Sequence, residues 1–284
     1  MLQVSTRAVL ITLMIAASVF LGGCGTPSQP ASGTGGSSRP RAASVASATA
    51  AAPAAAPGEA VAAGSSLGSD LAAVDPAVLP AGSLFRNPAN GRDEVITGDT
   101  ERTALLIGDS QSEPKASWPR RALADLGYDV FFCGKGGTGY VASNGATGNY
   151  VDALQRGDWH LPYGFPPLVV IQGGGNDARQ GASDEQIVAN AESLITTLKQ
   201  RYPGAKLVMV GTLAKGTGRR TEVDALLGSV AAAHSIPFVS VGDWLTRYGL
   251  EEHLADSVHM NDDGHRALGM LLGDRLEALG LDLD

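Results

Sequence analysis

The sequence predicts a three-layer α/β protein built on a parallel sheet of five strands. Short apolar runs alternate along the chain with segments of helical spacing, which is the order of elements in such proteins. The run from Leu168 to Ile171 is apolar at every position, so it suits a strand that is buried on both faces of a sheet. Together these two observations predict a parallel sheet covered by helices on both sides.

The elements follow in order from residue 103 onward. The expected strands cover residues 103–107, 128–133, 168–172, 206–210 and 238–241. The expected helices cover residues 118–126, 183–202, 221–234 and 263–279. Gly127 fits the position after the first helix, and Ser183 with Gln186 forms a capping-box pattern at the start of the second. Five strand–helix units therefore account for most of the chain after residue 98.

The N-terminus reads as an export signal over residues 1–23. Arg7 precedes an uncharged apolar stretch, residues 8–23, which as a helix would extend about 24 Å against a bilayer core of about 30 Å. The segment Leu21-Gly22-Gly23-Cys24 resembles the bacterial lipobox, and this resemblance implies cleavage before Cys24 and lipidation of its thiol. A chance cysteine after an ordinary signal peptide is the alternative. We expect an exported protein that is anchored by lipid to the outer side of the cytoplasmic membrane.

Three further segments complete the expected domain organisation. Residues 24–66 are rich in Ala, Pro, Gly and Ser, so they bury too little apolar surface to fold and predict a disordered tether. A G-x-S-x-G match at residues 64–68 falls at the end of this tether and lacks the strand and helix that the motif needs. Residues 67–98 are expected to form an irregular lead-in on the domain surface. The folded α/β domain is assigned to residues 99–284.

Composition excludes several classes of protein. The formal net charge is −8, which disfavours binding to nucleic acid because phosphate backbones need clustered Lys and Arg. The two cysteines cannot build a disulfide framework, and no metal-ligand spacing is present, so we expect neither metal nor cofactor. With Cys24 lipidated, Cys133 is expected to be a free thiol in the core. A G-x-G-x-x-G match at residues 134–139 follows a strand, but no helix pattern follows it.

Polar residues of catalytic type follow the predicted strands. Ser110 comes directly after the first strand, Asn176 follows the third, and a pair formed by Asp256 and His259 comes after the fifth. Ligands bind beyond the carboxyl ends of parallel strands, so these side chains are expected to meet at one edge. Asp256 and His259 are three residues apart, which allows the carboxylate to orient the imidazole. A serine nucleophile, a base and an amide donor would then share one site.

These blocks resemble the SGNH, or GDSL-type, hydrolase family. The resemblance spans about residues 103–279 and implies a flavodoxin-like sheet and acyl-ester chemistry. It implies Ser110 as nucleophile, His259 as base and Asp256 as its orienting partner. The oxyanion hole would consist of the Ser110 N–H, a glycine N–H and the Asn176 side chain. The glycine is expected to be Gly137, with Gly136 and Gly139 as alternatives.

The sequence departs from the family pattern at two places, and it leaves three candidate functions open. Gln111 stands where the GDSL signature has Leu, a change expected to matter little, and the second block lacks the usual Ser-Gly-Asp pattern. The first function is an extracytoplasmic esterase acting on acylated glycans, lipids or small esters. The second is an O-acyltransferase with the same acyl-enzyme, and the third is a non-catalytic binding lipoprotein of the cell envelope.

Overall fold

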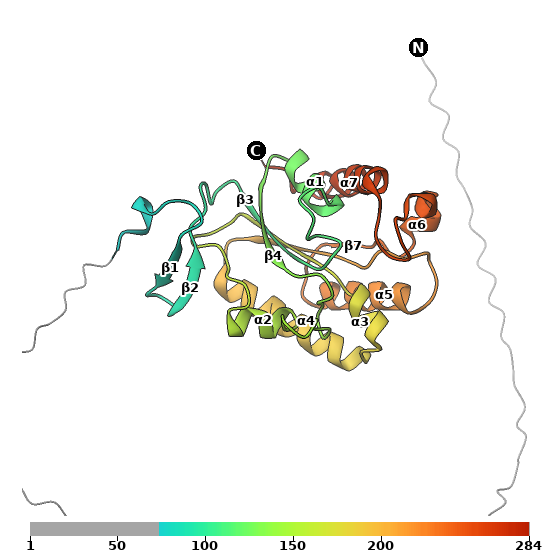
Figure 1. Cartoon of the computed structure of the whole chain (residues 1–284), viewed down its shortest axis with the longest axis horizontal. Coiled ribbons are helices and arrows are strands. Elements are labelled where there is room, and N and C mark those ends of the chain that lie inside the picture. Colours follow the sequence, from blue (N-terminus) through green and yellow to red (C-terminus); the bar gives the residue numbers. More distant parts are fainter. Residues whose placement is uncertain (1–73, 284) are drawn as a thin grey trace, which may run out of the picture. The chain divides into compact units, whose positions relative to one another are not determined.

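The computed structural model describes residues 74–283, which belong to the compact unit Gly68–Asp284 (Figure 1). The expected export signal (residues 1–23), the lipidated Cys24 and the tether (residues 24–66) lie outside the described residues. Within residues 74–283, no helix is both long and apolar enough to cross a membrane.

The described unit is built on a parallel five-stranded sheet. Its strands, in chain order, are β3 (Thr103–Gly108), β4 (Asp129–Gly134), β5 (Leu168–Gln172), β6 (Lys206–Val210) and β7 (Phe238–Val239). Their order across the sheet is β4-β3-β5-β6-β7, and each neighbouring pair is parallel. Counted within the sheet, this is the order 2-1-3-4-5 of flavodoxin-like proteins. The predicted fold class is therefore confirmed.

Helices cover both faces of the sheet, as Figure 1 shows. One face carries α1, α6 and α7, and the other carries α2, α3, α4 and α5. Their bounds are α1 (Trp118–Asp125), α2 (Tyr150–Arg156), α3 (Gly175–Gln180), α4 (Asp184–Arg201), α5 (Arg219–Ala233), α6 (Trp244–Arg247) and α7 (Asp262–Glu277). Short 3₁₀ turns occupy Pro76–Val78 and Leu250–His253. The capping box predicted at the start of α4 is present.

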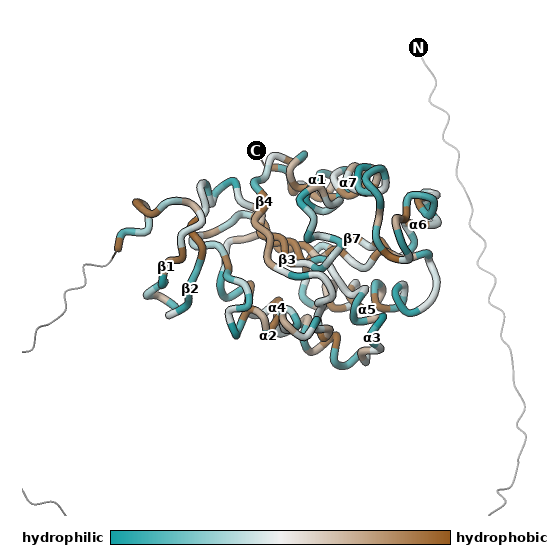
Figure 2. The backbone as a smooth tube through the Cα atoms, in the orientation of Figure 1, coloured by the Kyte–Doolittle hydropathy of each residue, from teal (hydrophilic) through white to brown (hydrophobic). Residues whose placement is uncertain are grey.

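Two apolar cores, one on each face, hold the sheet between its helices. In β3, Leu105 and Ile107 belong to the core under α2, α4 and α5, whereas Ala104 and Leu106 belong to the core under α1 and α7. In Figure 2 the strands β3 and β4 are mostly hydrophobic, whereas hydrophobic and hydrophilic residues alternate along the helices on either side. Cys133 is buried in β4 and is a free thiol, as expected, and burial raises its pKa far above the ordinary range. A strand with both faces buried accounts for the continuous apolar runs of the sequence.

The structure corrects the sequence prediction at three places. Residues 67–98 were expected to be irregular, but β1 (Leu84–Asn87) and β2 (Arg92–Val95) pair there as an antiparallel hairpin. Helices α2 and α3 fall in segments for which the sequence predicted no helix. Both helices are short and glycine-flanked, so their sequences resemble turns and their helical form depends on tertiary contacts. Strand β7 ends at Val239, two residues earlier than predicted.

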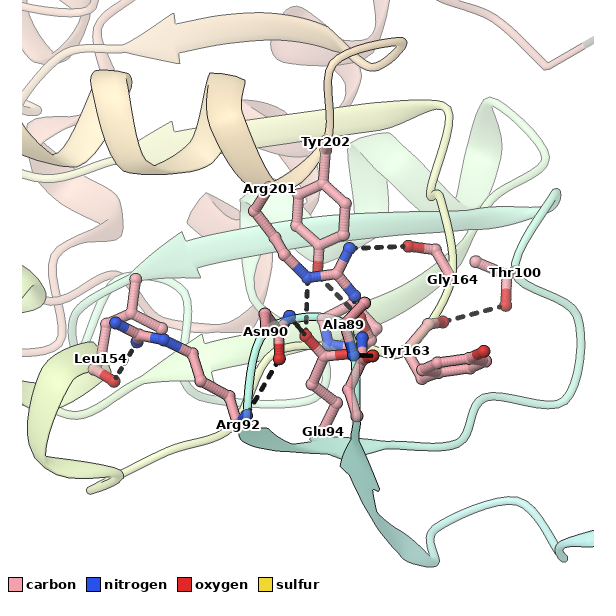
Figure 3. A network of polar contacts seen from close by, with 12 residues as sticks. Ala89, Asn90, Arg92, Glu94, Thr100, Leu154, Tyr163, Gly164, Arg201 and Tyr202 are labelled. Carbon is pink, nitrogen blue, oxygen red and sulfur yellow. Dashed lines mark hydrogen bonds and ion pairs between the residues drawn. The ribbon is translucent and has the colours of Figure 1, made fainter. Parts of the chain in front are cut away.

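A buried ion pair joins the hairpin to the end of α4 (Figure 3). The Arg201 guanidinium contacts both carboxylate oxygens of Glu94, at 2.6 and 2.7 Å. Asn87 and Asn90 donate to the same two oxygens, each at 2.8 Å. The Glu94 side chain is only 2% exposed, so each lone pair of its carboxylate needs a partner. The hairpin is therefore docked by polar contacts that no hydrophobic pattern could have revealed.

We predict that Arg201→Ala lowers the free energy of unfolding by about 3–5 kcal/mol, because it leaves the Glu94 carboxylate buried without its counter-charge. Chemical denaturation followed by circular dichroism measures this loss. The matched control is Arg86→Ala, which breaks the exposed pair of Arg86 with Asp93 on the same hairpin and should cost no more than about 1 kcal/mol. Equal effects of the two substitutions would contradict the structural role given to the buried pair.

Candidate active site

The loops that follow β3, β4 and β5 meet the segment that precedes α7 at the carboxyl edge of the sheet. The strand order reverses at β3, because the next strand along the chain, β4, lies on one side of β3 and the strand after it, β5, lies on the other. Such a switch point is where open α/β sheets bind ligands. A cavity of about 420 Å³ opens at this edge, and Ser110, Gly137, Asn176 and His259 all line it. The structure thus brings together the side chains predicted from four separate stretches of sequence.

A chain of two hydrogen bonds connects the serine to the acid. Ser110 Oγ lies 2.9 Å from His259 Nε2, and His259 Nδ1 lies 2.7 Å from Asp256 Oδ2. The imidazole can therefore donate through Nδ1 to the carboxylate and accept the serine proton at Nε2. The contact between Ser110 and His259 joins residues that are 149 positions apart in the chain.

Asp256 also shapes the loop that carries the imidazole. Its Oδ1 accepts the backbone N–H groups of Val258 and His259, each at 2.7 Å. The hydrogen bond from the His259 side chain, together with these two, holds the pKa of Asp256 well below its usual range. The carboxylate is exposed to solvent and stays ionised at neutral pH, so it faces the imidazole as an anion.

Backbone hydrogen bonds distinguish the three candidate oxyanion glycines. The Gly136 N–H donates to Glu113 Oε2 at 2.8 Å, and the Gly139 N–H donates to the Ala142 carbonyl at 2.9 Å. The N–H groups of Gly137 and Ser110 have no acceptor among residues 74–283, and both residues line the cavity. Gly137 has φ +84°, a conformation that glycine adopts without strain. The geometry therefore favours Gly137 over its two neighbours.

The Asn176 side chain lies in the first turn of α3 rather than in a loop. Its Nδ2 donates to the Thr138 carbonyl at 3.0 Å and to Asp109 Oδ2 at 3.2 Å. These two bonds fix which end of the amide faces the cavity. A carbonyl oxygen entering the site would share the Nδ2 protons with these acceptors, and the longer bond to Asp109 is the weaker of the two.

Asp177, next to Asn176, braces the loop that carries Gly137. It is fully buried, and its two carboxylate oxygens accept the backbone N–H groups of Tyr140, Val141 and Ala142 at 2.7–3.1 Å. A Cβ at Gly139 would lie 2.3 Å from Asp177 Oδ2, so glycine is required there for the carboxylate to reach the loop. Asp177 therefore acts as a hydrogen-bond acceptor that braces this loop.

Asp109, directly before the serine, is a buried carboxylate to which sequence reasoning gave no role. Its Oδ1 accepts the Gln111 N–H at 2.8 Å, which shapes the turn that presents Ser110. Burial, aided by the nearby charge of Asp177, raises the pKa of Asp109 to about 6. The hydrogen bond from Gln111 and the charges of Arg220 and His259 oppose this rise. The Gly-Asp-Ser turn was visible in the sequence, but the burial of its acid was not.

The raised pKa of Asp109 predicts a pH dependence of stability. Its ordinary value is 3.8, so between about pH 4 and pH 6 the folded chain keeps a proton that the unfolded chain releases. The stabilising contribution of the protonated group is complete below this window and is lost as the pH rises through it. We expect the unfolding free energy of the wild type, minus that of Asp109→Asn, to fall by about 2–3 kcal/mol between pH 4 and pH 7.

Urea unfolding of both proteins at several pH values measures this difference. Any constant offset from the new amide cancels in the comparison. A difference that does not vary with pH would show that Asp109 titrates in the folded chain as it does in the unfolded one.

Gln111 joins the serine turn to the histidine loop. Its Nε2 donates to the Val258 carbonyl at 2.7 Å, and its Oε1 accepts from the indole Nε1 of Trp118 at 3.2 Å. The side chain is only 8% exposed. A glutamine in place of leucine was expected to matter little, but its side chain is hydrogen-bonded to Val258, the residue directly before His259. A long-range contact of this kind leaves no pattern in the sequence.

We predict that Gln111→Leu lowers kcat for a good ester substrate about 10-fold and leaves KM nearly unchanged, because His259 loses a support that fixes its position. Steady-state kinetics on 4-nitrophenyl acetate measures the effect. Gln180→Leu, an exposed glutamine that becomes the same residue, is the matched control and should retain full activity. A Gln111→Leu enzyme with wild-type kcat would show that Val258 holds its place without this bond.

A serine, an imidazole and a carboxylate joined at the carboxyl edge of a parallel sheet define the class of serine hydrolases with a flavodoxin-like fold. The family model for GDSL-like lipases and acylhydrolases matches residues 97–267, which is more than half of the chain. The chain therefore belongs to the GDSL-like lipase/acylhydrolase family and is a hydrolase. No curated protein matches it.

Solved structures of carbohydrate esterases share this fold. An active-site mutant of a family two carbohydrate esterase from Clostridium thermocellum superposes with a TM-score of 0.51 at 17% identity, covering 68% of this chain and 69% of that one. A family two carbohydrate esterase from Cellvibrio japonicus gives a TM-score of 0.52 at 16% identity, covering 66% of this chain and 64% of that one. Their likeness to this chain lies in the fold.

Proposed function

We propose that the protein is a serine esterase that cleaves carboxylic esters through an acyl-Ser110 intermediate. The observation that carries this proposal is the connected chain of Ser110, His259 and Asp256, at 2.9 and 2.7 Å, beside two backbone N–H groups that lack an acceptor in the described part of the chain. Nucleophile, base and oxyanion donors thus surround one cavity. This arrangement suits acyl transfer and requires no metal or organic cofactor.

The first step forms the acyl-enzyme. A serine hydroxyl is a weak nucleophile at neutral pH, so His259 Nε2 takes the Ser110 proton as Oγ attacks the ester carbonyl carbon. Asp256 stabilises the imidazolium that results, as its two loop hydrogen bonds keep it ionised and in place. The imidazolium then protonates the leaving alkoxide, and the C–O bond of the ester breaks.

The charge that develops on the carbonyl oxygen meets donors already in position. The N–H groups of Ser110 and Gly137 and the Nδ2 of Asn176 form the proposed oxyanion hole, and each such donor contributes roughly 3–4 kcal/mol in comparable sites. In the second step His259 takes a proton from water, which attacks the acyl carbon and releases Ser110. One carboxylic acid and one alcohol leave for each water consumed.

We infer that the substrate is an acylated carbohydrate. Amide, hydroxyl and guanidinium groups are present among the residues that line the cavity, and the fold is shared with two carbohydrate esterases. We also propose that the enzyme works outside the cytoplasmic membrane, anchored by a lipid on Cys24. The apolar stretch and the lipobox-like Leu21-Gly22-Gly23-Cys24 support this location. Growth of cells with labelled palmitate, comparing the wild type with Cys24→Ala, tests the anchor.

We expect Ser110→Ala to abolish ester cleavage while the fold is kept, because only one hydroxyl at the cavity wall is removed. Release of acetate from acetylated xylan, and labelling of the protein by a fluorophosphonate probe, both measure the loss. Ser257→Ala removes a different hydroxyl from the same cavity and should keep both activities. Turnover by the Ser110→Ala enzyme would refute the acyl-serine mechanism. Adding free sugars to the assay separates hydrolysis from acyl transfer, since a transferase would yield acylated sugar.

A further inference from the structure

A second cavity adjoins the proposed active site and is strongly basic. Its volume is about 440 Å³, and it shares part of its wall with the cavity that contains Ser110. The shared wall consists of Arg179, Leu213, Arg220, Ser257 and Val258. We name this second cavity, with its side chains Arg179, Lys215, Arg219 and Arg220, the basic lobe. Basic side chains gathered beside the nucleophile stand out in a chain whose net charge is −8.

Two of the four cations in the basic lobe are neutralised by nearby carboxylates. Lys215 lies 2.6 Å from Glu251, and Arg219 lies 2.6 Å from Asp184 with a second contact to Glu222 at 3.6 Å. These pairs fold the two side chains toward the protein's own acids. Their charges are therefore largely satisfied.

Arg179 and Arg220 are different, since neither forms an ion pair with any residue in the described range. Arg179, on α3, makes one long hydrogen bond of 3.4 Å to Asn176 Oδ1. Arg220, at the start of α5, is partly buried beside Gly175, and no hydrogen bond of its guanidinium is found within residues 74–283. Burial lowers its pKa, Arg179 adds a repulsion, and the buried Asp109 is the nearby carboxylate that opposes them. A partly desolvated guanidinium without an acceptor is costly, so this side chain is poised for an external anion.

We propose that Arg179 and Arg220 bind a carboxylate carried by the ester substrate, so that the enzyme prefers anionic esters over neutral ones. A planar guanidinium offers paired N–H donors that match the two oxygens of a carboxylate. Both arginines line the cavity that contains Ser110, so the anion and the scissile ester would belong to one molecule. This assignment rests on the proposed esterase function and narrows its substrate class to esters with a negative charge near the scissile bond.

The carboxylate could belong to either side of the ester bond. On the acyl side it would be the free end of a dicarboxylic acid, and on the alcohol side it would be the acid group of an acylated uronic acid. Two substrate pairs separate these sources. The acyl pair is 4-nitrophenyl hemisuccinate against 4-nitrophenyl butyrate, and the alcohol pair is the mono-O-acetylated methyl glucuronoside against the corresponding methyl glucoside.

In at least one pair we expect the wild-type enzyme to show a kcat/KM about 10-fold or more in favour of the anionic ester at low salt. Arg220→Met and Arg179→Met should each reduce that preference, which is the ratio of kcat/KM for the anionic ester to kcat/KM for the neutral one, by about 10-fold. Higher ionic strength should weaken the preference of the wild type, as expected for partly exposed charges. Arg86→Met, on the distant hairpin, is the matched control and should leave all rates unchanged.

The outcomes separate this assignment from the function on which it rests. If the neutral esters are cleaved in a Ser110-dependent way and neither pair shows an anionic preference, the esterase proposal stands and the carboxylate site is refuted. If no ester is cleaved and the fluorophosphonate probe does not label Ser110, both proposals fail. A preference that survives in both arginine variants would also overturn the site. Arg179 is exposed, so Arg179→Met tests the idea even if Arg220→Met unfolds the protein.

Discussion

The site depends on one geometric constraint, which is that parallel strands end at the same edge of their sheet. β4, β3 and β5 are neighbours in the sheet, so the segments that follow them, which carry Gly137, Ser110 and Asn176, must emerge at the same edge. The chain returns to this edge once more after β7 and delivers His259 against the serine. No single segment contains a working site, and the topology alone makes the four segments neighbours.

Buried carboxylates then turn this proximity into fixed geometry. Asp109 shapes the serine turn and accepts a hydrogen bond from the Asn176 amide, while Asp177 accepts three backbone N–H groups of the loop that carries Gly137. Asp224 does the same between α5 and the end of the sheet, where it accepts from Ser240 and from the Val241 N–H. A carboxylate can accept several hydrogen bonds at once, which makes it an effective brace for irregular backbone. Part of the acidic composition of the chain is therefore structural.

Charge is distributed unevenly around the proposed site. Arg and Lys side chains line the cavity around Ser110 and the adjoining basic lobe. Among the described residues that line these two cavities, Asp109 is the only acid. The net negative charge of the chain gave no hint of this local reversal. A substrate that is repelled by the rest of the surface can still be held at such a wall, because the potential inside a cleft is set mainly by the groups that line it.

The sequence alone determined the sheet, its helical layers and the polar residues that follow each strand. Continuous apolar runs and glycine-flanked loops encode these features locally, and the family resemblance rested on the same short blocks. The sequence did not reveal three other features: the hairpin Leu84–Val95, the burial of Asp109 and the hydrogen bond from Gln111 to Val258. Each of these depends on contacts between residues distant in the chain, whose partners only the folded structure brings within reach. The preference for Gly137 over Gly136 and Gly139 also comes from the tertiary structure, because it depends on which backbone N–H groups are left without an acceptor among the described residues.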